Sequence, residues 1–311
     1  GNSHLIIDNA GYNVYNLWGG NSHTVKGGNG KDIFNLDGGN GHDIDMGDGA
    51  NRMTVVSGNN HVIKGGNGND ELYFNGGIGT SVNAGDGSNK IVISGGSTCS
   101  FISGDGNDII NITGGAYHSV DAGGGNNTFN ISGGNFNTIN CTAAGKNTVT
   151  IYNGANSVQF ASNYNYDSDD TIVIKGGNNH IIQTAGGKDT ITVTGGTGHS
   201  IFGGKENVTV YARGGSDYTV QTASDSIDNR IEISGTAKNI TVKQEMHASD
   251  SITVKWSGGM GIIKINTAPN LETYGSQDTD HLSIYDVTSD KFHFSQNGNS
   301  LLVESSTTTY G

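Results

Sequence analysis

Apolar residues recur along this chain at intervals of 19 positions, within short segments that alternate apolar and polar side chains. That alternation is the two-residue period of a half-buried β-strand. A first apolar column consists of Ile6, Val25, Ile44, Ile63, Val82, Phe101, Val120, Ile139 and Val158. A second reads Tyr15, Phe34, Met53, Leu72, Ile91, Ile110 and Phe129, then, at irregular spacing, Val149, Ile172, Ile191, Val208, Ile231 and Ile252. A third lies two residues after the second, from Leu17 and Leu36 to Val193, Val210 and Ile233.

Two strands in every 19 residues, separated by Gly, Asn and Asp, are typical of a solenoid whose coils stack in parallel about 4.8 Å apart. The sequence therefore predicts an all-β protein, a β-roll-like parallel β-solenoid of about 13 coils over residues 1–265. Residues 266–311 are predicted to form one further coil and a capping hairpin about Asn297 and Gly298. Breaks in the period at 161–169, 223–228 and 243–249 predict short lateral loops.

The composition agrees with a thin repetitive core. The 311 residues include 52 glycines and one proline, and 32% are hydrophobic. The net charge of −13 argues against nucleic acid as a partner, and no apolar run approaches the ~18 residues of a membrane span, so we expect no membrane insertion.

Cys99 and Cys141 lie two coils apart, about 9.5 Å along the axis. That exceeds the ~7 Å limit for a disulfide, so both are expected to be buried thiols.

The turns on one side of the predicted coil share a glycine-rich motif that ends in aspartate. We call this side the nine edge, because nine residues separate the flanking apolar columns there; ten separate them at the opposite side, the ten edge. Nine-edge turns read Gly27-Gly28-Asn29-Gly30-Lys31-Asp32, Gly65-Gly66-Asn67-Gly68-Asn69-Asp70 and Gly104-Asp105-Gly106-Asn107-Asp108. These turns resemble the RTX nonapeptide GGxGxDxUx of the calcium-binding parallel β-roll, with Phe34, Leu72 and Ile110 at the buried U position.

This resemblance implies a secreted bacterial protein whose turns bind Ca²⁺ between neighbouring coils. A hard cation takes six or more oxygens at about 2.3–2.6 Å, which carboxylates and turn carbonyls can supply. The implied carboxylate ligands are Asp32, Asp70, Asp108, Asp48, Asp86, Asp105 and Asp189. The implied carbonyl ligands are those of Gly27, Asn29, Gly65, Asn67 and Gly104.

The aspartate column departs from the RTX pattern, because Asn alternates with Asp over the first half of the chain. It reads Asn13, Asp32, Asn51, Asp70, Asn89, Asp108, Asn127, Asn147, Asp170, Asp189, Glu206, Asn229 and Asp250. A neutral side chain in every second coil halves the number of carboxylates and should weaken or remove cation sites. The alternative interpretation is a metal-free ladder in which Asn amides hydrogen-bond to carboxylates in the coils above and below. Both interpretations stand at this point.

The ten edge carries a histidine column where an RTX motif would place aspartate. Its histidines are His4, His23, His42, His61, His118, His180 and His199. Imidazole suits zinc and transition metals rather than calcium, so one interpretation is a metal site between rings of adjacent coils. We favour a ladder of stacked imidazoles that bond turn carbonyls, because no carboxylate or thiolate regularly completes a coordination sphere. Protonation of four such rings is expected to loosen the N-terminal coils below about pH 6.

We expect no catalysis, because GxSxG, HExxH and P-loop motifs are absent and no long loops wall a cleft. A basic or aromatic stripe along one strand row would indicate polyanion binding. The outward row, which shows no such stripe, reads Asn35, Thr54, Tyr73, Val92, Asn111, Asn130, Thr150, Val173, Thr192 and Thr209. A threonine column suited to ice binding begins at Thr128, Thr148, Thr171 and Thr190, but Arg52, Glu71 and Lys90 interrupt it earlier.

The sequence thus favours a non-catalytic extracellular structural or adhesive module, stiffened by Ca²⁺ if the RTX-like turns bind it. A carbohydrate-binding accessory module of a secreted enzyme, such as a polysaccharide epimerase, is the alternative, and ice binding is a lesser one. The expected partners are surface glycans or other copies of the chain, which would belong to a larger secreted protein.

Overall fold

The computed structural model describes residues 1–141, 143–160, 169–204, 207–223, 228–244, 251–255, 262–267, 281–285, 291–297 and 300–306. The chain is an all-β parallel β-solenoid of about 12 turns with a spacing near 19 residues, which confirms the predicted fold class. The lateral loops predicted from breaks in the period fall largely outside the described residues. Among the described residues, no helix has the length and apolar character needed to cross a membrane.

Contacts between residues divide the chain into two compact units, Gly1–Gln159 and Phe160–Gly311. The strands of the first unit are β1 (Leu5–Ile7), β2 (Val14–Trp18), β3 (Thr24–Lys26), β4 (Ile33–Asn40), β5 (Asp43–Asp45), β6 (Arg52–Asn59), β7 (Val62–Lys64), β8 (Glu71–Phe74), β9 (Ser81–Asn83), β10 (Lys90–Ile93), β11 (Ser100–Ile102), β12 (Ile109–Ile112), β13 (Ser119–Asp121), β14 (Thr128–Ile131), β15 (Asn135–Cys141), β16 (Thr148–Ile151) and β17 (Ala155–Phe160), which ends at the boundary. Those of the second unit are β18 (Thr171–Ile174), β19 (Ile181–Gln183), β20 (Thr190–Val193), β21 (Ser200–Phe202), β22 (Thr209–Ala212), β23 (Thr219–Gln221), β24 (Arg230–Ile233), β25 (Thr241–Gln244), β26 (Ser251–Lys255), β27 (Ile262–Thr267), β28 (His281–Tyr285), β29 (Lys291–Asn297) and β30 (Ser300–Ser306).

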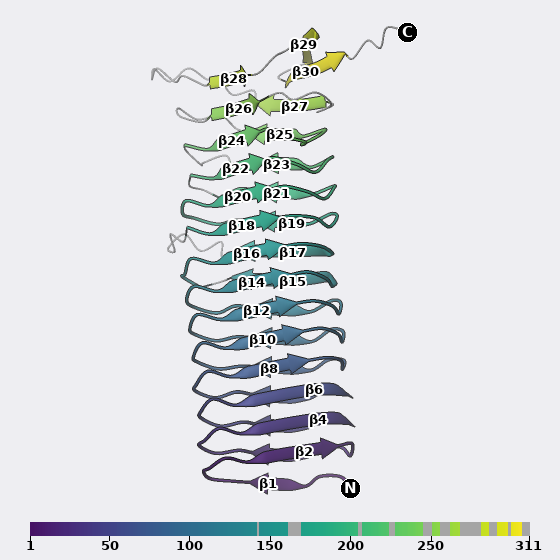
Figure 1. The fold of residues 1–311 in the computed structure, drawn as a ribbon, viewed down its shortest axis with the longest axis vertical. Helices are drawn as coiled ribbons and strands as arrows, with labels where there is room; N and C mark the ends of the chain where they lie inside the picture. The colour runs from purple at the N-terminus through teal and green to yellow at the C-terminus, as the bar shows by residue number, and fades with distance from the viewer. Residues whose placement is uncertain are drawn as a thin grey trace. The chain divides into compact units, whose positions relative to one another are not determined.

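In each unit the coil strands pair in parallel within two sheets, one on either side of a narrow core (Figure 1). The pairs that β30 forms with β27 and with β29 are antiparallel. In the first unit, β1 to β17 form one sheet from the odd-numbered strands and a second from the even-numbered ones. Phe34 in β4 pairs with Met53 in β6, one period further along. Because successive coils keep this register, each residue lies directly over its equivalent, and the columns seen in the sequence become columns in space.

The core consists of the predicted apolar columns. Along β4, Phe34 and Leu36 are fully buried, whereas Asn35 between them is partly exposed. Val25 in β3 is buried from the opposite sheet. Aromatic rings also stack from coil to coil, as in Tyr15 and Phe34, whose centroids lie 4.7 Å apart. Cys99 and Cys141 are both buried, as predicted.

The structure corrects the predicted register at β22. Val210 rather than Val208 pairs with Ile191 in the second column, and Ala212 rather than Val210 pairs with Val193 in the third. The error arose because Val208, Val210 and Ala212 alternate with polar residues, and a shift of two residues leaves the same face of a strand inward. The residue that follows Thr192 in the outward row is therefore Tyr211 and not Thr209.

The C-terminal strands include the predicted additional coil and hairpin. β28 pairs in parallel with β26, so residues 281–285 do form a further coil strand. β29 and β30 pair antiparallel, with Asn297 opposite Ser300, and β30 also pairs antiparallel with β27. The predicted hairpin is thus confirmed, although Gly298 itself lies outside the described residues.

The glycine three residues before the ten-edge column makes room for the column side chain. Gly39 adopts a φ of +76°, and a Cβ there would collide with Nε2 of His42 and with the carbonyl oxygen of Gly20. Gly38 also has a positive φ, +91°, but the nearest atom to a Cβ there lies 3.6 Å away. Gly38 needs glycine for its backbone conformation, whereas Gly39 needs it for conformation and for space.

We predict that Gly39→Ala destabilises the protein more than Gly38→Ala. Alanine at a left-handed position costs about 1–2 kcal/mol in both variants. The collision with His42 and Gly20 should add about 1–3 kcal/mol in Gly39→Ala alone. Urea unfolding followed by circular dichroism measures the difference. Equal midpoints for the two variants would contradict the spatial role of Gly39.

Candidate functional site

The aspartates and asparagines of the nine-edge column point inward and are buried. In each case the side-chain oxygen Oδ1 accepts the backbone N–H of the equivalent residue in the preceding coil. Asp32 accepts from Asn13 at 2.8 Å, and Asn51 in turn accepts from Asp32 at 2.9 Å. The same bond continues through Asp70, Asn89, Asp108, Asn127 and Asn147, and in the second unit joins Asp170 to Asp189. The column is a hydrogen-bonded ladder between coils.

Asparagine and aspartate differ in the second polar atom of the side chain, which is Nδ2 in asparagine and Oδ2 in aspartate. Asn89 donates from Nδ2 to the carbonyl oxygens of Gly85 at 2.9 Å and of Ser103 at 3.0 Å. In Asp70 the corresponding atom is Oδ2, which is buried and makes no hydrogen bond. Oδ2 of Asp70 and the carbonyl oxygen of Ala84 lie on the same side of Gly65. Ala84 is the equivalent of Ser103 one coil earlier. The Oδ2 atoms that share this environment are those of Asp32, Asp70, Asp108 and Asp189.

At Asp70, Asp108 and Asp189, burial shifts the equilibrium toward the neutral acid. Burial raises the pKa of Asp70 to about 7, although the hydrogen bonds from Asn51 oppose the shift. Burial likewise raises the pKa of Asp189 to about 7 and that of Asp108 to about 6. A proton on Oδ2 would turn that atom into a donor, as Nδ2 is in asparagine.

The remaining nine-edge acids lie on the outside of the turns. Asp48, Asp86 and Asp105 are exposed, and Oδ1 of Asp48 accepts from Nδ2 of Asn67 at 2.9 Å. The inner and outer acids therefore do not converge. Within the described residues, no group of three His, Cys, Asp or Glu side chains could hold a metal ion.

The carbonyls proposed as calcium ligands are partly occupied by backbone hydrogen bonds. The carbonyl of Asn29 accepts the N–H of Gly11 at 2.9 Å, and that of Asn67 accepts the N–H of Gly49 at 2.7 Å. The carbonyls of Gly27, Gly65 and Gly104 belong to the same set of turns.

The ten-edge histidines form a ladder of the same construction. Nδ1 of His42 accepts the backbone N–H of His23 at 3.1 Å, and Nδ1 of His61 accepts that of His42 at 3.2 Å. Their rings stack 4.9 Å apart and within 2° of parallel. The same bond links His4 to His23, Cys99 to His118 and His180 to His199. Asn137 accepts from His118 in the same way, at 2.9 Å.

The second ring nitrogen points toward the turn interior. Nε2 lies 3.1 Å from the Gly176 carbonyl in His180 and 3.2 Å from the Gly195 carbonyl in His199, so it carries the proton. The hydroxyl of Tyr218, next in the column, donates to the Gly214 carbonyl at 3.1 Å. Nδ1 is thus committed to the neighbouring coil, whereas Nε2 reaches a turn carbonyl in His180 and His199 and has no hydrogen-bond partner in His42, His61 and His118.

Neutral imidazoles are favoured at His42, His61, His118 and His199. Burial lowers the pKa of His61 to about 4, and the adjacent His42 ring lowers it further. Burial and the His180 ring do the same for His199, whose pKa is about 4. The pKa values of His42 and His118 are lowered as well, again mainly by burial.

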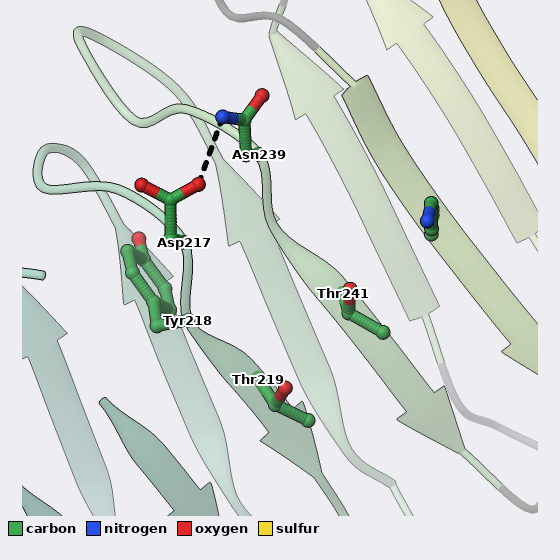
Figure 2. A pocket seen from close by; sticks show the side chains of 6 residues that line it. Asp217, Tyr218, Thr219, Asn239 and Thr241 are labelled. Atoms are coloured by element: carbon green, nitrogen blue, oxygen red, sulfur yellow. Dashed lines mark hydrogen bonds between the residues drawn. The ribbon is translucent and has the colours of Figure 1, made fainter. Parts of the chain in front are cut away.

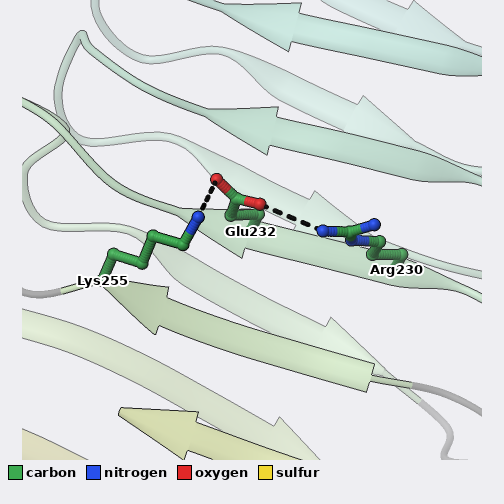
Figure 3. A network of polar contacts seen from close by, with 3 residues as sticks. All are labelled: Arg230, Glu232 and Lys255. Atoms are coloured by element: carbon green, nitrogen blue, oxygen red, sulfur yellow. Dashed lines mark hydrogen bonds and ion pairs between the residues drawn. The ribbon is translucent and has the colours of Figure 1, made fainter. Parts of the chain in front are cut away.

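The sequence analysis missed a cluster of charged and aromatic side chains on the outward face of the second unit. The buried carboxylate of Glu232 bridges Arg230 and Lys255, each at 3.3 Å (Figure 3). The guanidinium of Arg213, which directly follows β22, lies 4.6 Å from the ring centroid of Tyr211 in β22. The misplaced register at β22 hid this cluster, because it put Thr209 where Tyr211 lies.

The second unit also has an open polar pocket of about 360 Å³ between the turns and strands around β23 and β25 (Figure 2). Asp217 and Asn239 project from two successive turns, and the Asn239 amide donates to the Asp217 carboxylate at 2.9 Å. Hydrogen bonds from Ser216 and Asn239 lower the pKa of Asp217. The one carboxylate of this pocket is therefore already engaged within the protein.

The chain was compared with protein-family models, with curated proteins and with solved structures, and none of them matched. The likeness to RTX repeats therefore rests on the turn motif and on a solenoid architecture compatible with a β-roll.

We predict that His61→Asn stabilises the protein relative to wild type as the medium is acidified. The pKa of His61 is lower in the folded chain than its unfolded value of about 6.5. Its contribution to stability is therefore full above pH 6.5 and is lost as the pH falls toward 4. Asparagine accepts the same hydrogen bond without titrating. Thermal midpoints of both proteins from pH 7.5 to 4 measure the difference, and the reverse change, Asn137→His, should give the opposite trend. A difference between variant and wild type that does not change with pH would contradict this account.

We predict that Asp70→Asn stabilises the protein relative to wild type as the pH rises. The pKa of Asp70 is raised to about 7 in the folded chain, so its contribution is full below about pH 4 and is lost as the pH rises through 7. Asparagine supplies the donor at every pH. The thermal midpoints should be compared in EDTA from pH 4 to 8, with Asp86→Asn as an exposed control of equal charge change. A variant less stable than wild type at pH 8 would contradict the proposed role of the proton.

Proposed function

We propose that this chain is a non-catalytic structural or adhesive module, in which stacked turns build the scaffold and exposed strand faces make the contacts. The observation that carries this proposal is the use of the Asp and His side chains. At both edges they are buried and accept backbone N–H groups of the adjacent coil, as Asp70 and His42 do. Side chains committed in this way are out of reach of a substrate.

An extracellular location, as part of a larger secreted bacterial protein, accompanies this proposal. It rests on the RTX-like turns such as Gly65-Gly66-Asn67-Gly68-Asn69-Asp70. Surface glycans or further copies of the chain are the proposed partners.

Calcium is the metal that these turns imply, and the inner donor set does not fit it well. Ca²⁺ takes six or more oxygen ligands. The Asp70 side chain offers one carboxylate oxygen without a hydrogen bond. In the coils on either side, Asn51 and Asn89 offer no carboxylate and direct N–H groups at the equivalent carbonyls. N–H groups are donors and not metal ligands. We therefore propose a metal-free ladder, with calcium stiffening as the prediction to be tested against it.

A carbohydrate-binding module is the second candidate function, and one observation favours it. On the outward face of the second unit, Arg213 and Arg230 lie over the Tyr211 ring. Arg230 and Lys255 pair with Glu232 (Figure 3). Cations beside an aromatic ring are the kind of surface that recognises acidic sugars.

Ice binding has less support, because the threonine column of this unit, Thr171, Thr190 and Thr209, ends at Arg230.

We predict that the protein unfolds at the same temperature in EDTA and in millimolar Ca²⁺, Mg²⁺ or Zn²⁺. A metal that binds only the folded state would raise the midpoint with its concentration. Circular dichroism at pH 7.5 measures the unfolding, and Asp70→Asn/Asp108→Asn serves as a matched variant without two of the inner carboxyls. A Ca²⁺-selective rise in wild type that this variant loses would overturn the metal-free ladder and establish the RTX-like sites. A rise that the variant keeps would assign calcium to the outer acids instead.

A further inference from the structure

The outward face formed by β18, β20, β22, β24 and β26 has a charge opposite to that of the chain as a whole. Among the residues that the structure describes, its charged side chains are Lys175, Arg213, Arg230, Lys255 and Glu232, four cations against one acid, for a net charge of +3. The whole chain carries −13. A local field of reversed sign attracts anions that the rest of the surface repels.

The cations on this face are held in place by their neighbours. The Arg213 guanidinium lies over the Tyr211 ring at 4.6 Å, and Arg230 lies on the same ring at 5.9 Å. Oε2 of Glu232 pairs with Arg230 and Oε1 with Lys255 (Figure 3). Because Glu232 is buried beneath these partners, it positions them and leaves little negative charge exposed.

The positioned cations remain available to a partner. The side chains of Arg230 and Lys255 are 53% and 49% exposed. A guanidinium that rests with its face on a tyrosine ring keeps its N–H edge for a bidentate contact with a carboxylate or sulfate.

Three of the cations lie in one column at every second coil. Thr194 lies over Lys175, Arg213 over Thr194 and Ser234 over Arg213, and Lys255 follows in the next coil. Lys175, Arg213 and Lys255 are therefore spaced by two coils, about 9.6 Å each. An extended polysaccharide that turns over at each sugar presents its acid groups to one side at every second unit, which is the same alternation.

We propose that this face binds an acidic glycan, a polysaccharide bearing carboxylates or sulfates, along the column Lys175, Arg213 and Lys255. The proposal deepens the adhesive and carbohydrate-binding function proposed above and rests on it. Thr192 and Thr194, with Thr171, Thr190 and Thr209 beside them, supply hydroxyls for the sugar. Val173 is the one aliphatic side chain at the described outward positions of these strands, so the face offers little to an apolar protein partner.

The test compares Lys175→Gln/Arg213→Gln with wild type in binding to polygalacturonate, dextran sulfate and neutral dextran. These two side chains are chosen because neither forms the ion pairs of Glu232. Lys188→Gln/Lys243→Gln is the matched control, since it removes two exposed charges of the same unit away from this face. Affinity is measured by calorimetry at 50 and 200 mM NaCl, and folding of each variant by its thermal midpoint.

We expect wild type to bind one or both acidic polymers, more weakly at high salt, and not to bind neutral dextran. The Lys175→Gln/Arg213→Gln variant should lose about tenfold in affinity at an unchanged thermal midpoint, and the control should lose much less. The proposal is overturned by absence of binding to both acidic polymers, by equal losses in the two variants, or by duplex DNA binding as tightly as the glycans. None of these outcomes changes the metal dependence of unfolding, which tests the proposed scaffold separately.

Discussion

Backbone N–H groups at the turns are the constraint on which this solenoid depends. Along the strands, each amide finds a carbonyl in the neighbouring coil, but at both edges the chain must turn, and a buried amide without a partner is costly. At many turns the chain meets this demand with a side chain that reaches from the next coil and accepts the amide, as Asp32 does for Asn13 and His42 for His23. The 19-residue period follows, because the acceptor must return to the same place above each turn.

The same constraint explains which residue types replace one another in the two columns. Asp and Asn carry an oxygen on Cγ, and His carries Nδ1 on Cγ, so each places an acceptor at nearly the same point. The second polar atom differs, and it must agree with the carbonyls that the turn directs inward. Nδ2 of Asn89 and Nε2–H of His180 satisfy them as donors, whereas an ionised Asp cannot donate. In the first unit, alternating Asp with Asn keeps carboxyl groups from lying directly over one another about 4.8 Å apart, where like charges repel strongly in a buried site.

Periodicity alone was sufficient to predict the fold, because columns such as Ile44 and Phe34 must be buried by their neighbours in any stacked arrangement. It also identified both edge columns, but not what their side chains do. A column of Asp32, Asp70 and Asp108 has the same period whether the carboxylates point outward to a cation or inward to an amide, and only the backbone conformation of the turn decides this. The register at β22 was ambiguous for a related reason: Val208 and Val210 lie on the same face of the strand, and Ala212 is a weak apolar signal beside them. The cluster about Tyr211 depends on that register and could not be predicted without it.

The structure separates the residues that build the coils from those that are free to vary. Turn residues are tied to the coil above and below, so a change at Gly39 or His61 affects stability before it affects anything else. Outward strand positions carry no such restriction, and charge can accumulate there without disturbing the ladder. Lys175, Arg213 and Lys255 occupy positions of this kind, on a protein whose net charge is otherwise strongly negative. Cations gathered on one face do little to reduce the electrostatic repulsion within an acidic chain. They do give that face an electrostatic potential that differs from that of its surroundings. That difference is a physical reason to look for the partner of this protein on the cationic face rather than at the RTX-like turns.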